Sequence, residues 1–238
     1  MSFTYHEPTS VDEALALLER HGEDAHVVAG ATSFTLLWRQ GLLRPAHVVG
    51  LRRIEALRGI ERTRDGLVIG ATASHREVEL SPLVREFCPA LARAFGSVAT
   101  VRVRNQATVG GNLAHADPAQ DPPPMLIALG AEVAVAGRAG ERRIAAEDLF
   151  VDVLTTSLEP GEIITAVHIP APREGTRAAY EKFLPRTQDD YATVSVGAAL
   201  RLDDAGVITD VRIALGSVGP TPRRARAVED AVRGKRVD

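Results

Sequence analysis

Two segments built from small and polar residues have the composition of anion-binding turns. The first covers residues 27–34 and reads Val-Val-Ala-Gly-Ala-Thr-Ser-Phe, where an apolar run passes into a pattern with helical spacing. A strand-to-helix turn of small residues points backbone N–H groups outward near a helix N-terminus, which favours a phosphate or pyrophosphate. Thr32 and Ser33 add hydroxyl donors. The same turn is also common as a purely structural connection, so it does not define a site by itself.

The second segment covers residues 107–124 and reads Ala-Thr-Val-Gly-Gly-Asn-Leu-Ala-His-Ala-Asp-Pro-Ala-Gln-Asp-Pro-Pro-Pro. Its glycine pair, Gly110 and Gly111, predicts a turn with backbone conformations that other residues avoid. Thr108 and Asn112 offer directional hydrogen bonds, and Asp121 precedes a helix started by proline, where a carboxylate can cap the helix or bind a ribose hydroxyl. Long polar loops marked by Gly and Pro are often functional, and we interpret this one as a binding segment.

Other chemistries are disfavoured by the same residues. Neither segment matches the dinucleotide fingerprint G-x-G-x-x-G or the phosphate-binding G-x-x-x-x-G-K-[ST], which argues against a Rossmann domain and a P-loop ATPase. His115, Asp117 and Asp121 fit no common metal-ligand spacing, so we expect no metal there. His75 and His168 have no acidic or nucleophilic residue at a spacing typical of catalytic sites. The sequence therefore predicts no catalytic acid, base or nucleophile.

Cys88 is the single cysteine of the chain. One thiol excludes an intramolecular disulfide and an iron–sulfur cluster, which needs about four ligands, and it excludes zinc held by paired thiolates. Cys88 lies between apolar neighbours, so we interpret it as a buried, inert thiol. Redox chemistry in this chain would therefore require an organic cofactor.

Composition limits the classes of partner. The chain has 238 residues, 45% of them hydrophobic and only 4% aromatic, and a formal net charge of −3. It is long enough for one or two domains with a core of Ala, Val, Leu and Ile, and its charge provides no general field for nucleic acid or an anionic membrane. No run of 18 apolar residues predicts a transmembrane segment, and no signal peptide is recognisable at the N-terminus, so we expect a cytoplasmic protein.

The elements that must position the two segments follow from periodicity and capping. Strands at residues 3–5, 26–29 and 48–51 alternate with helices starting after Ser10, which pairs with Glu13 in a capping box, and after residue 30. This order predicts a small parallel sheet within the first 55 residues. We then expect a strand at residues 66–71 and helices that begin near Ser74, at Ser81 and at Pro122. Five strands follow, at residues 132–136, 162–169, 178–184, 193–202 and 207–215. A last helix is expected from Thr221.

The stretch at residues 170–175 is rich in Pro and Gly and predicts a domain boundary. We expect a first domain at residues 1–171, with subdomains of about 1–55 and 56–171, and a C-terminal domain at 172–238. The second domain is expected to be an incomplete antiparallel sheet domain, because three strands and one helix leave one face of the sheet poorly covered.

Together the two segments resemble the motifs of a known family. Residues 29–33 are similar to its A-G-G-T-[DS] turn, and residues 108–114, with Pro118 and Asp121, resemble its T-[VI]-G-G-N-[LI]-A…P…D signature. Order and spacing agree from Phe3 to about Arg226. The chain is thereby identified as a member of the FAD-binding (medium) subunits of the molybdenum hydroxylase, or molybdopterin dehydrogenase, family. This family includes aerobic carbon monoxide dehydrogenase and the flavin domain of xanthine dehydrogenase.

The resemblance implies an α+β fold of the vanillyl-alcohol-oxidase-like FAD-binding type, with two α+β subdomains and a C-terminal antiparallel sheet domain. It assigns roles to specific positions. The pyrophosphate of FAD would lie against the first segment, a second clamp would come from the second segment, aliphatic residues would pack on the cofactor, and a lysine and an aromatic ring would lie near the flavin. The corresponding residues are Val27, Val28, Ala29, Gly30, Ala31, Thr32, Ser33 and Phe34; Thr108, Gly110, Gly111, Asn112 and Asp121; Ile163 and Ile164; Lys182; and Tyr191.

The resemblance also implies a division of labour between chains. A molybdopterin subunit would hydroxylate the substrate, and a 2Fe-2S subunit would deliver electrons to FAD in this chain, which passes them to an external acceptor such as NAD, a quinone or dioxygen. One departure stands out, because Ala31 replaces the second glycine of the family turn, and a methyl group is costly if this position requires a positive φ. The alternatives are a scaffold subunit that no longer holds FAD and a self-contained flavin oxidoreductase.

Overall fold

The protein is described by a computed structural model that covers residues 2–185, 187 and 189–237. Helices and strands are interspersed along the chain, which confirms the predicted α+β class. The helices are α1 (Val11–His21), α2 (Thr32–Arg39), α3 (His75–Leu80), α4 (Pro82–Phe87), α5 (Pro89–Gly96), α6 (Val101–Gln106), α7 (Val109–His115), α8 (Pro122–Ala128) and α9 (Arg226–Val232). The strands are β1 (Thr4–His6), β2 (Ala25–Val28), β3 (His47–Gly50), β4 (Ile60–Thr63), β5 (Gly66–Gly70), β6 (Glu132–Gly137), β7 (Gly140–Ala145), β8 (Phe150–Asp152), β9 (Thr155–Thr156), β10 (Ile163–Pro170), β11 (Thr176–Phe183), β12 (Val194–Leu202), β13 (Ile208–Gly216) and β14 (Arg223–Arg224).

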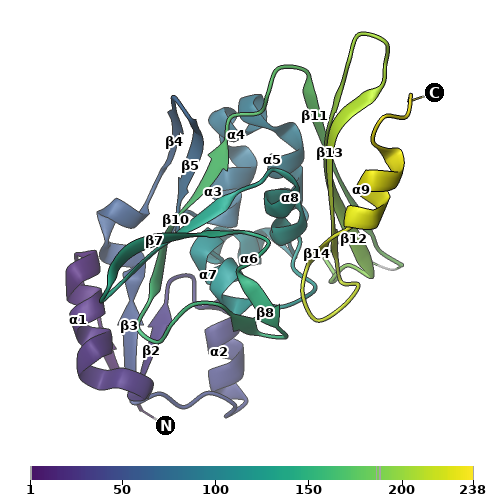
Figure 1. Cartoon of the computed structure of the whole chain (residues 1–238). Helices are drawn as coiled ribbons and strands as arrows, with labels where there is room; N and C mark the ends of the chain where they lie inside the picture. The colour runs from purple at the N-terminus through teal and green to yellow at the C-terminus, as the bar shows by residue number, and fades with distance from the viewer. Residues whose placement is uncertain (1, 186, 188, 238) are drawn as a thin grey trace.

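The N-terminal sheet is parallel, with strand order β1-β3-β2, as the alternation of strands and helices predicts. Its two faces carry different helices, because neighbouring residues of a strand point to opposite sides. Val27 packs with the buried residues of α1, whereas His26 stacks its ring on Phe34 of α2, with centroids 5.4 Å apart. In Figure 1 this sheet lies with α1 and α2 at one end of the molecule.

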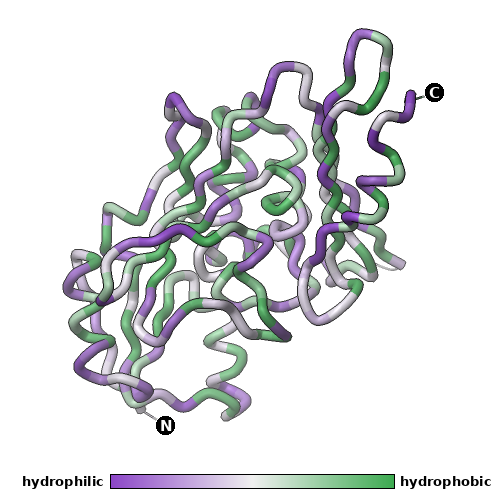
Figure 2. Tube along the Cα trace, viewed as in Figure 1, coloured by the Kyte–Doolittle hydropathy of each residue, from purple (hydrophilic) through white to green (hydrophobic). Residues whose placement is uncertain are grey.

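The central sheet contains the core of the protein. Its strand order is β4-β5-β10-β6-β7, and every pairing is antiparallel. The helices α3, α4, α5, α7 and α8 contribute to the same buried cluster, which is built mainly from Ala, Val, Leu and Ile as the composition predicts. In Figure 2 the short helix α8 is strongly hydrophobic, and the tip of the β4–β5 hairpin is hydrophilic.

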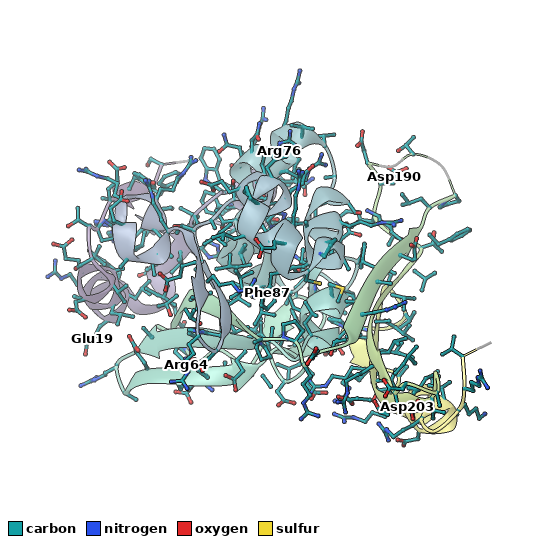
Figure 3. All side chains as sticks on the ribbon, turned by 90° about the horizontal axis from the view of Figure 1, so that it is seen from above. Glu19, Arg64, Arg76, Phe87, Asp190 and Asp203 are labelled. Atoms are coloured by element: carbon teal, nitrogen blue, oxygen red, sulfur yellow. The ribbon has the colours of Figure 1, made fainter. Side chains whose placement is uncertain are left out.

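The C-terminal sheet is antiparallel, in the order β11-β12-β13-β14, and packs against α8. The last helix, α9, begins at Arg226 and not at Thr221 as predicted, because the preceding residues first pair with β13 as β14. Glu19 on α1 and Asp203 after β12 mark opposite ends of the molecule in Figure 3. None of the described helices has the length and apolar character that crossing a membrane would require.

Gly197 permits the close packing of β12 on α8. A Cβ atom at this position would lie 2.6 Å from the backbone carbonyl carbon and oxygen of Pro124. We therefore expect Gly197→Ala to lower the free energy of unfolding by about 1–3 kcal/mol, the usual cost of overpacking a core. Chemical denaturation measures this change. Gly219→Ala is the matched control, because its Cβ would meet only Arg223 Nε at 3.8 Å; an equal loss in both variants would contradict the packing argument.

Candidate functional site

The two glycine segments meet in one cavity of about 720 Å³. Its size is typical of sites for small organic ligands, which occupy roughly 300–1,000 Å³. All of the site residues predicted from the sequence line this cavity except Lys182. The cavity is bounded by the end of β2 and the start of α2, by the N-terminal part of α7, by the start of β10 and by the loop after β11.

The first segment begins α2 in an unusual way. Ala31 is the N-cap of α2 and has φ 58° and ψ 17°, which is the left-handed region. Because alanine has no side-chain acceptor, no side chain caps the N–H groups of the first turn. Thr32 and Ser33 line the cavity at this helix end, where the helix dipole favours negative charge. This geometry suits a phosphate bound by backbone N–H groups, as the sequence predicts.

Gly30 brings the first segment into contact with the second. A Cβ on Gly30 would lie 1.9 Å from the carbonyl oxygen of Gln106 and 2.9 Å from the Cα of Ala107. These residues immediately precede Thr108, so the two segments touch through their backbones. No side chain can be accommodated at residue 30 without moving one segment away from the other.

The second segment differs from the turn that the sequence predicts. Residues 109–115 form the helix α7, and the Thr108 hydroxyl caps it by accepting a hydrogen bond from the Gly111 N–H at 3.2 Å. Neither glycine has a positive φ, so no special backbone conformation requires them, and Gly110 is required by packing. A Cβ on Gly110 would lie 2.7 Å from the Cβ of Ala71, whose carbonyl accepts the Gly110 N–H at 2.8 Å. These contacts attach α7 to the residue after β5.

Asp121 links the cavity to the C-terminal sheet. Its two carboxylate oxygens accept hydrogen bonds from Tyr180 Oη at 2.6 Å and from Lys182 Nζ at 2.9 Å, and Lys182 also donates to the Ser97 carbonyl. The carboxylate does not cap α8, although Asp121 occupies the N-cap position. Asp121 lines the cavity, whereas the ammonium of Lys182 reaches Asp121 from β11 and is nearly buried.

The charges of this trio follow from burial and from their mutual contacts. Burial raises the pKa of Asp121 above its usual value, while the hydrogen bonds from Tyr180 and Lys182 act in the opposite direction. Burial and the adjacent carboxylate raise the pKa of Tyr180 far above its usual value. Tyr180 therefore remains protonated and donates its hydrogen to Asp121 at all ordinary pH values.

Three polar side chains along the cavity have atoms with no hydrogen-bond partner among the described residues. They are His75, through both ring nitrogens, Asn112 through Oδ1 and Gln120 through Oε1. Buried polar atoms without a partner are costly, and these atoms have almost no accessible surface, so a ligand in the cavity could reach them only after the side chains move. Asn112 was predicted from the sequence. His75 and Gln120 were missed, because neither has a motif partner nearby in the chain.

The remaining predicted residues form an apolar wall and a rim. Ile163 and Ile164 are buried at the start of β10, next to an irregularity in its pairing with β6. Tyr191 lies in the loop after β11 and is 66% exposed. Asp190, its neighbour, is labelled on this loop in Figure 3. An aliphatic wall with an exposed aromatic ring at the edge suits a planar, partly apolar group.

The fold and the cavity define a protein that binds an organic cofactor carrying phosphate groups. An uncapped helix end, polar residues and an aliphatic wall line the same cavity. Comparison with known proteins makes the assignment more specific. Residues 1–172 match the family described as the FAD binding domain in molybdopterin dehydrogenase, and residues 178–238 match the CO dehydrogenase flavoprotein C-terminal domain.

Individual relatives agree with this family over nearly the whole chain. The carbon monoxide dehydrogenase medium chain of Hydrogenophaga pseudoflava is 36% identical over 233 residues, which are 98% of this chain and 80% of that protein. Caffeine dehydrogenase subunit beta of Pseudomonas sp. (strain CBB1) is 33% identical over 99% of this chain and 80% of its own length. A solved structure of the Hydrogenophaga pseudoflava carbon monoxide dehydrogenase superimposes with a TM-score of 0.96 at 37% identity, covering 100% of this chain and 82% of that one.

The chain therefore belongs to the FAD-binding family of the molybdopterin dehydrogenases. The family predicted from the two motifs, its oxidoreductase class and FAD as the cofactor are confirmed. The described residues fit the cofactor, because the uncapped N–H groups of α2 can bind its phosphates and Ile163 and Ile164 give the same cavity an aliphatic wall. FAD, when bound, supplies the capacity to accept and release electrons.

Neighbouring substitutions at Gly30 and Ala31 should have opposite effects. Gly30→Ala places a methyl group against the backbone of Gln106, so we expect it to lower the free energy of unfolding by about 1–3 kcal/mol and to weaken FAD binding. Ala31→Gly removes the strain of a left-handed alanine and should raise the free energy of unfolding by up to about 1 kcal/mol. Denaturation curves and FAD titrations measure both. A stabilising Gly30→Ala or a destabilising Ala31→Gly would contradict this geometry.

His75 should make the folded state sensitive to acid. Burial lowers the pKa of His75 to about 4, with a smaller contribution from Arg104, whereas the unfolded chain protonates it near 6.5. The unfolded state therefore binds more protons between these values, and stability falls as the pH drops from about 6.5 to 4, by at most about 1.4 kcal/mol per pH unit. NMR titration of the ring should show His75 neutral at pH 5. Wild-type and His75→Gln chains should differ in the slope of stability against pH; identical slopes would refute the assignment.

Proposed function

We propose that this chain is the flavin subunit of a multi-subunit molybdenum hydroxylase. In this role it receives electrons from a 2Fe-2S partner subunit and passes them, through FAD, to an external acceptor such as NAD, a quinone or dioxygen. One observation carries the proposal: both glycine segments line one cavity. The chain that contains this cavity belongs to a family of FAD-binding domains. The names of the relatives support the partner subunits, since the proteins from Hydrogenophaga pseudoflava and Pseudomonas are a medium chain and a subunit beta.

The roles of the cavity residues are part of the proposal. Residues 27–34 would bind the pyrophosphate through backbone N–H groups, and residues 108–112 would form the second clamp, with Thr108, Gly110, Gly111 and Asn112 closest to the cofactor. Ile163 and Ile164 would exclude water from one side of the cofactor, and Tyr191 would approach the isoalloxazine from the rim. These assignments rest on the position of each residue along the cavity.

Asp121 and Lys182 need a modified role. The sequence suggests a lysine beside the flavin, but the ammonium of Lys182 is paired with Asp121 and does not line the cavity. We propose that Lys182 acts through Asp121, by holding the carboxylate in place and compensating its charge. The Asp121 carboxylate, held in place and with its negative charge balanced by Lys182, would then accept a hydrogen bond from a ribose hydroxyl or from the phosphate side of FAD.

We also propose that residues 1–171 form the FAD-binding domain, with subdomains of about 1–55 and 56–171, and that residues 172–238 form the C-terminal domain. Two observations support this division. Most of the cavity lining comes from the first part, and Tyr180 and Lys182 of β11, in the second part, contact its residue Asp121. A cytoplasmic location is also part of the proposal.

A visible absorption spectrum tests FAD binding directly. The chain, incubated with excess FAD and passed through a desalting column, should show flavin bands with resolved fine structure and about one FAD per chain. Asn112→Leu removes a polar contact in the cavity and should weaken FAD binding about tenfold, the equivalent of one hydrogen bond. Asn105→Leu, the same change at an exposed position of α6, should bind FAD like the wild-type chain.

Other outcomes of this experiment distinguish the alternatives. A chain that stays colourless while FAD elutes free would favour the non-flavinylated scaffold subunit. A chain that binds FAD and oxidises small organic substrates without partners would favour the self-contained flavin oxidoreductase. The proposed subunit should bind FAD, leave such substrates unchanged, and become reduced when a reduced 2Fe-2S partner subunit is added.

A further inference from the structure

Three histidines from separate parts of the sequence gather at the N-terminal sheet, outside the cofactor cavity. They are His6 at the end of β1, His21 at the end of α1 and His47 at the start of β3. One ring nitrogen from each residue lies within 4.8 Å of the other two. None of the three lines the cavity described above. The cluster is therefore a feature that the proposed function does not use.

The register of the sheet explains why two of these rings meet. The parallel pairing places Thr4 opposite His47 and His6 opposite Val49. Residues paired in this way point to the same face, so His6 and His47 lie two positions apart on one face of the sheet. Val49 on that face packs in the same buried cluster as Ala14 and Leu18 of α1. This packing places His21, the last residue of α1, beside His6 and His47.

The distances within the cluster suit a metal ion. His6 Nε2 and His47 Nδ1 are 3.0 Å apart, and the rings of His21 and His47 are stacked with centroids 3.7 Å apart. A tetrahedral ion bound at about 2.0–2.1 Å from each imidazole nitrogen requires nitrogens roughly 3.3 Å from one another. To bind one ion, the stacked rings of His21 and His47 must turn until their nitrogen lone pairs, which lie in the ring planes, converge. The backbone positions from which the rings turn are already set by three packed elements.

The chemistry of the ligands limits the kind of ion. Imidazole nitrogen suits zinc, copper and nickel, whereas calcium and magnesium prefer oxygen. Neutral histidine is the form that binds metal. All three side chains are half-buried, so the site is shielded but remains accessible to an ion.

We propose that His6, His21 and His47 bind one divalent transition-metal ion of the zinc type. Three protein ligands leave the fourth position of a tetrahedral ion to water or another small ligand. The ion would join β1, α1 and β3, and would stabilise the sheet whose strand β2 leads into the first glycine segment. Since the folded chain alone brings the three rings together, bound metal would raise the stability of the folded state.

Zinc titration of the full chain tests this site. After treatment with a chelator and its removal, isothermal titration calorimetry with Zn²⁺ should give one site per chain, and Zn²⁺ should raise the melting temperature reversibly. His21→Gln and His47→Gln should each weaken Zn²⁺ binding by more than tenfold, since even outer-shell losses reduce metal affinity about 10–100-fold. His168→Gln, at a part-buried histidine of β10 outside the cluster, is the matched control and should bind Zn²⁺ like the wild-type chain.

NMR of the wild-type chain gives a second readout that does not depend on how the variants fold. Addition of Zn²⁺ should shift the ring signals of His6, His21 and His47 and leave those of His26, His75, His115 and His168 in place. The proposal is overturned if no Zn²⁺ binds to the wild-type chain, if His21→Gln and His47→Gln bind it as tightly as His168→Gln does, or if the shifted signals belong to other histidines.

Discussion

The contact between Gly30 and the backbone of Gln106 is the constraint on which the cofactor cavity depends. It sets the separation between the first segment, which starts α2, and the second, which starts α7. Neither segment is a complete binding site, because each supplies one helix end or a few polar atoms. Their contact through glycine places the uncapped end of α2 and the residue Asn112 around one cavity. Because residue 30 has no side chain, two binding segments that are distant in the sequence can lie in contact.

The C-terminal sheet is connected to this cavity by a second set of contacts. Gly197 allows β12 to approach the backbone of α8, and Tyr180 and Lys182 extend from β11 to Asp121, the residue that precedes α8. The negative charge of Asp121 is therefore compensated from outside the cavity and not by a cation within it. This arrangement leaves backbone dipoles as the main source of positive potential for phosphates, which agrees with a chain of formal net charge −3.

Much of the architecture could be predicted from local patterns. The alternation of strands and helices gave the parallel N-terminal sheet, Ser74 and Ser81 marked helix starts, and the apolar runs located β6 and β10–β13. The glycine pair of the second segment was misread as a turn, because the need for a small residue at Gly110 arises from Ala71, which is remote in sequence. His75 and Gln120 were missed for a similar reason. Their unpaired atoms become visible only when the folded chain shows which donors and acceptors lie within reach.

The central claim is that backbone N–H groups at the first segment bind the phosphates of the cofactor. Competitive fluorescence titration of the chain with FAD and with riboflavin, which has the same ring but no phosphate, tests this claim most directly. The account predicts that FAD binds at least about a hundredfold more tightly than riboflavin, because riboflavin leaves the helix end of α2 without an anion. Equal affinities for FAD and riboflavin would show that the ring alone is recognised and would contradict the account.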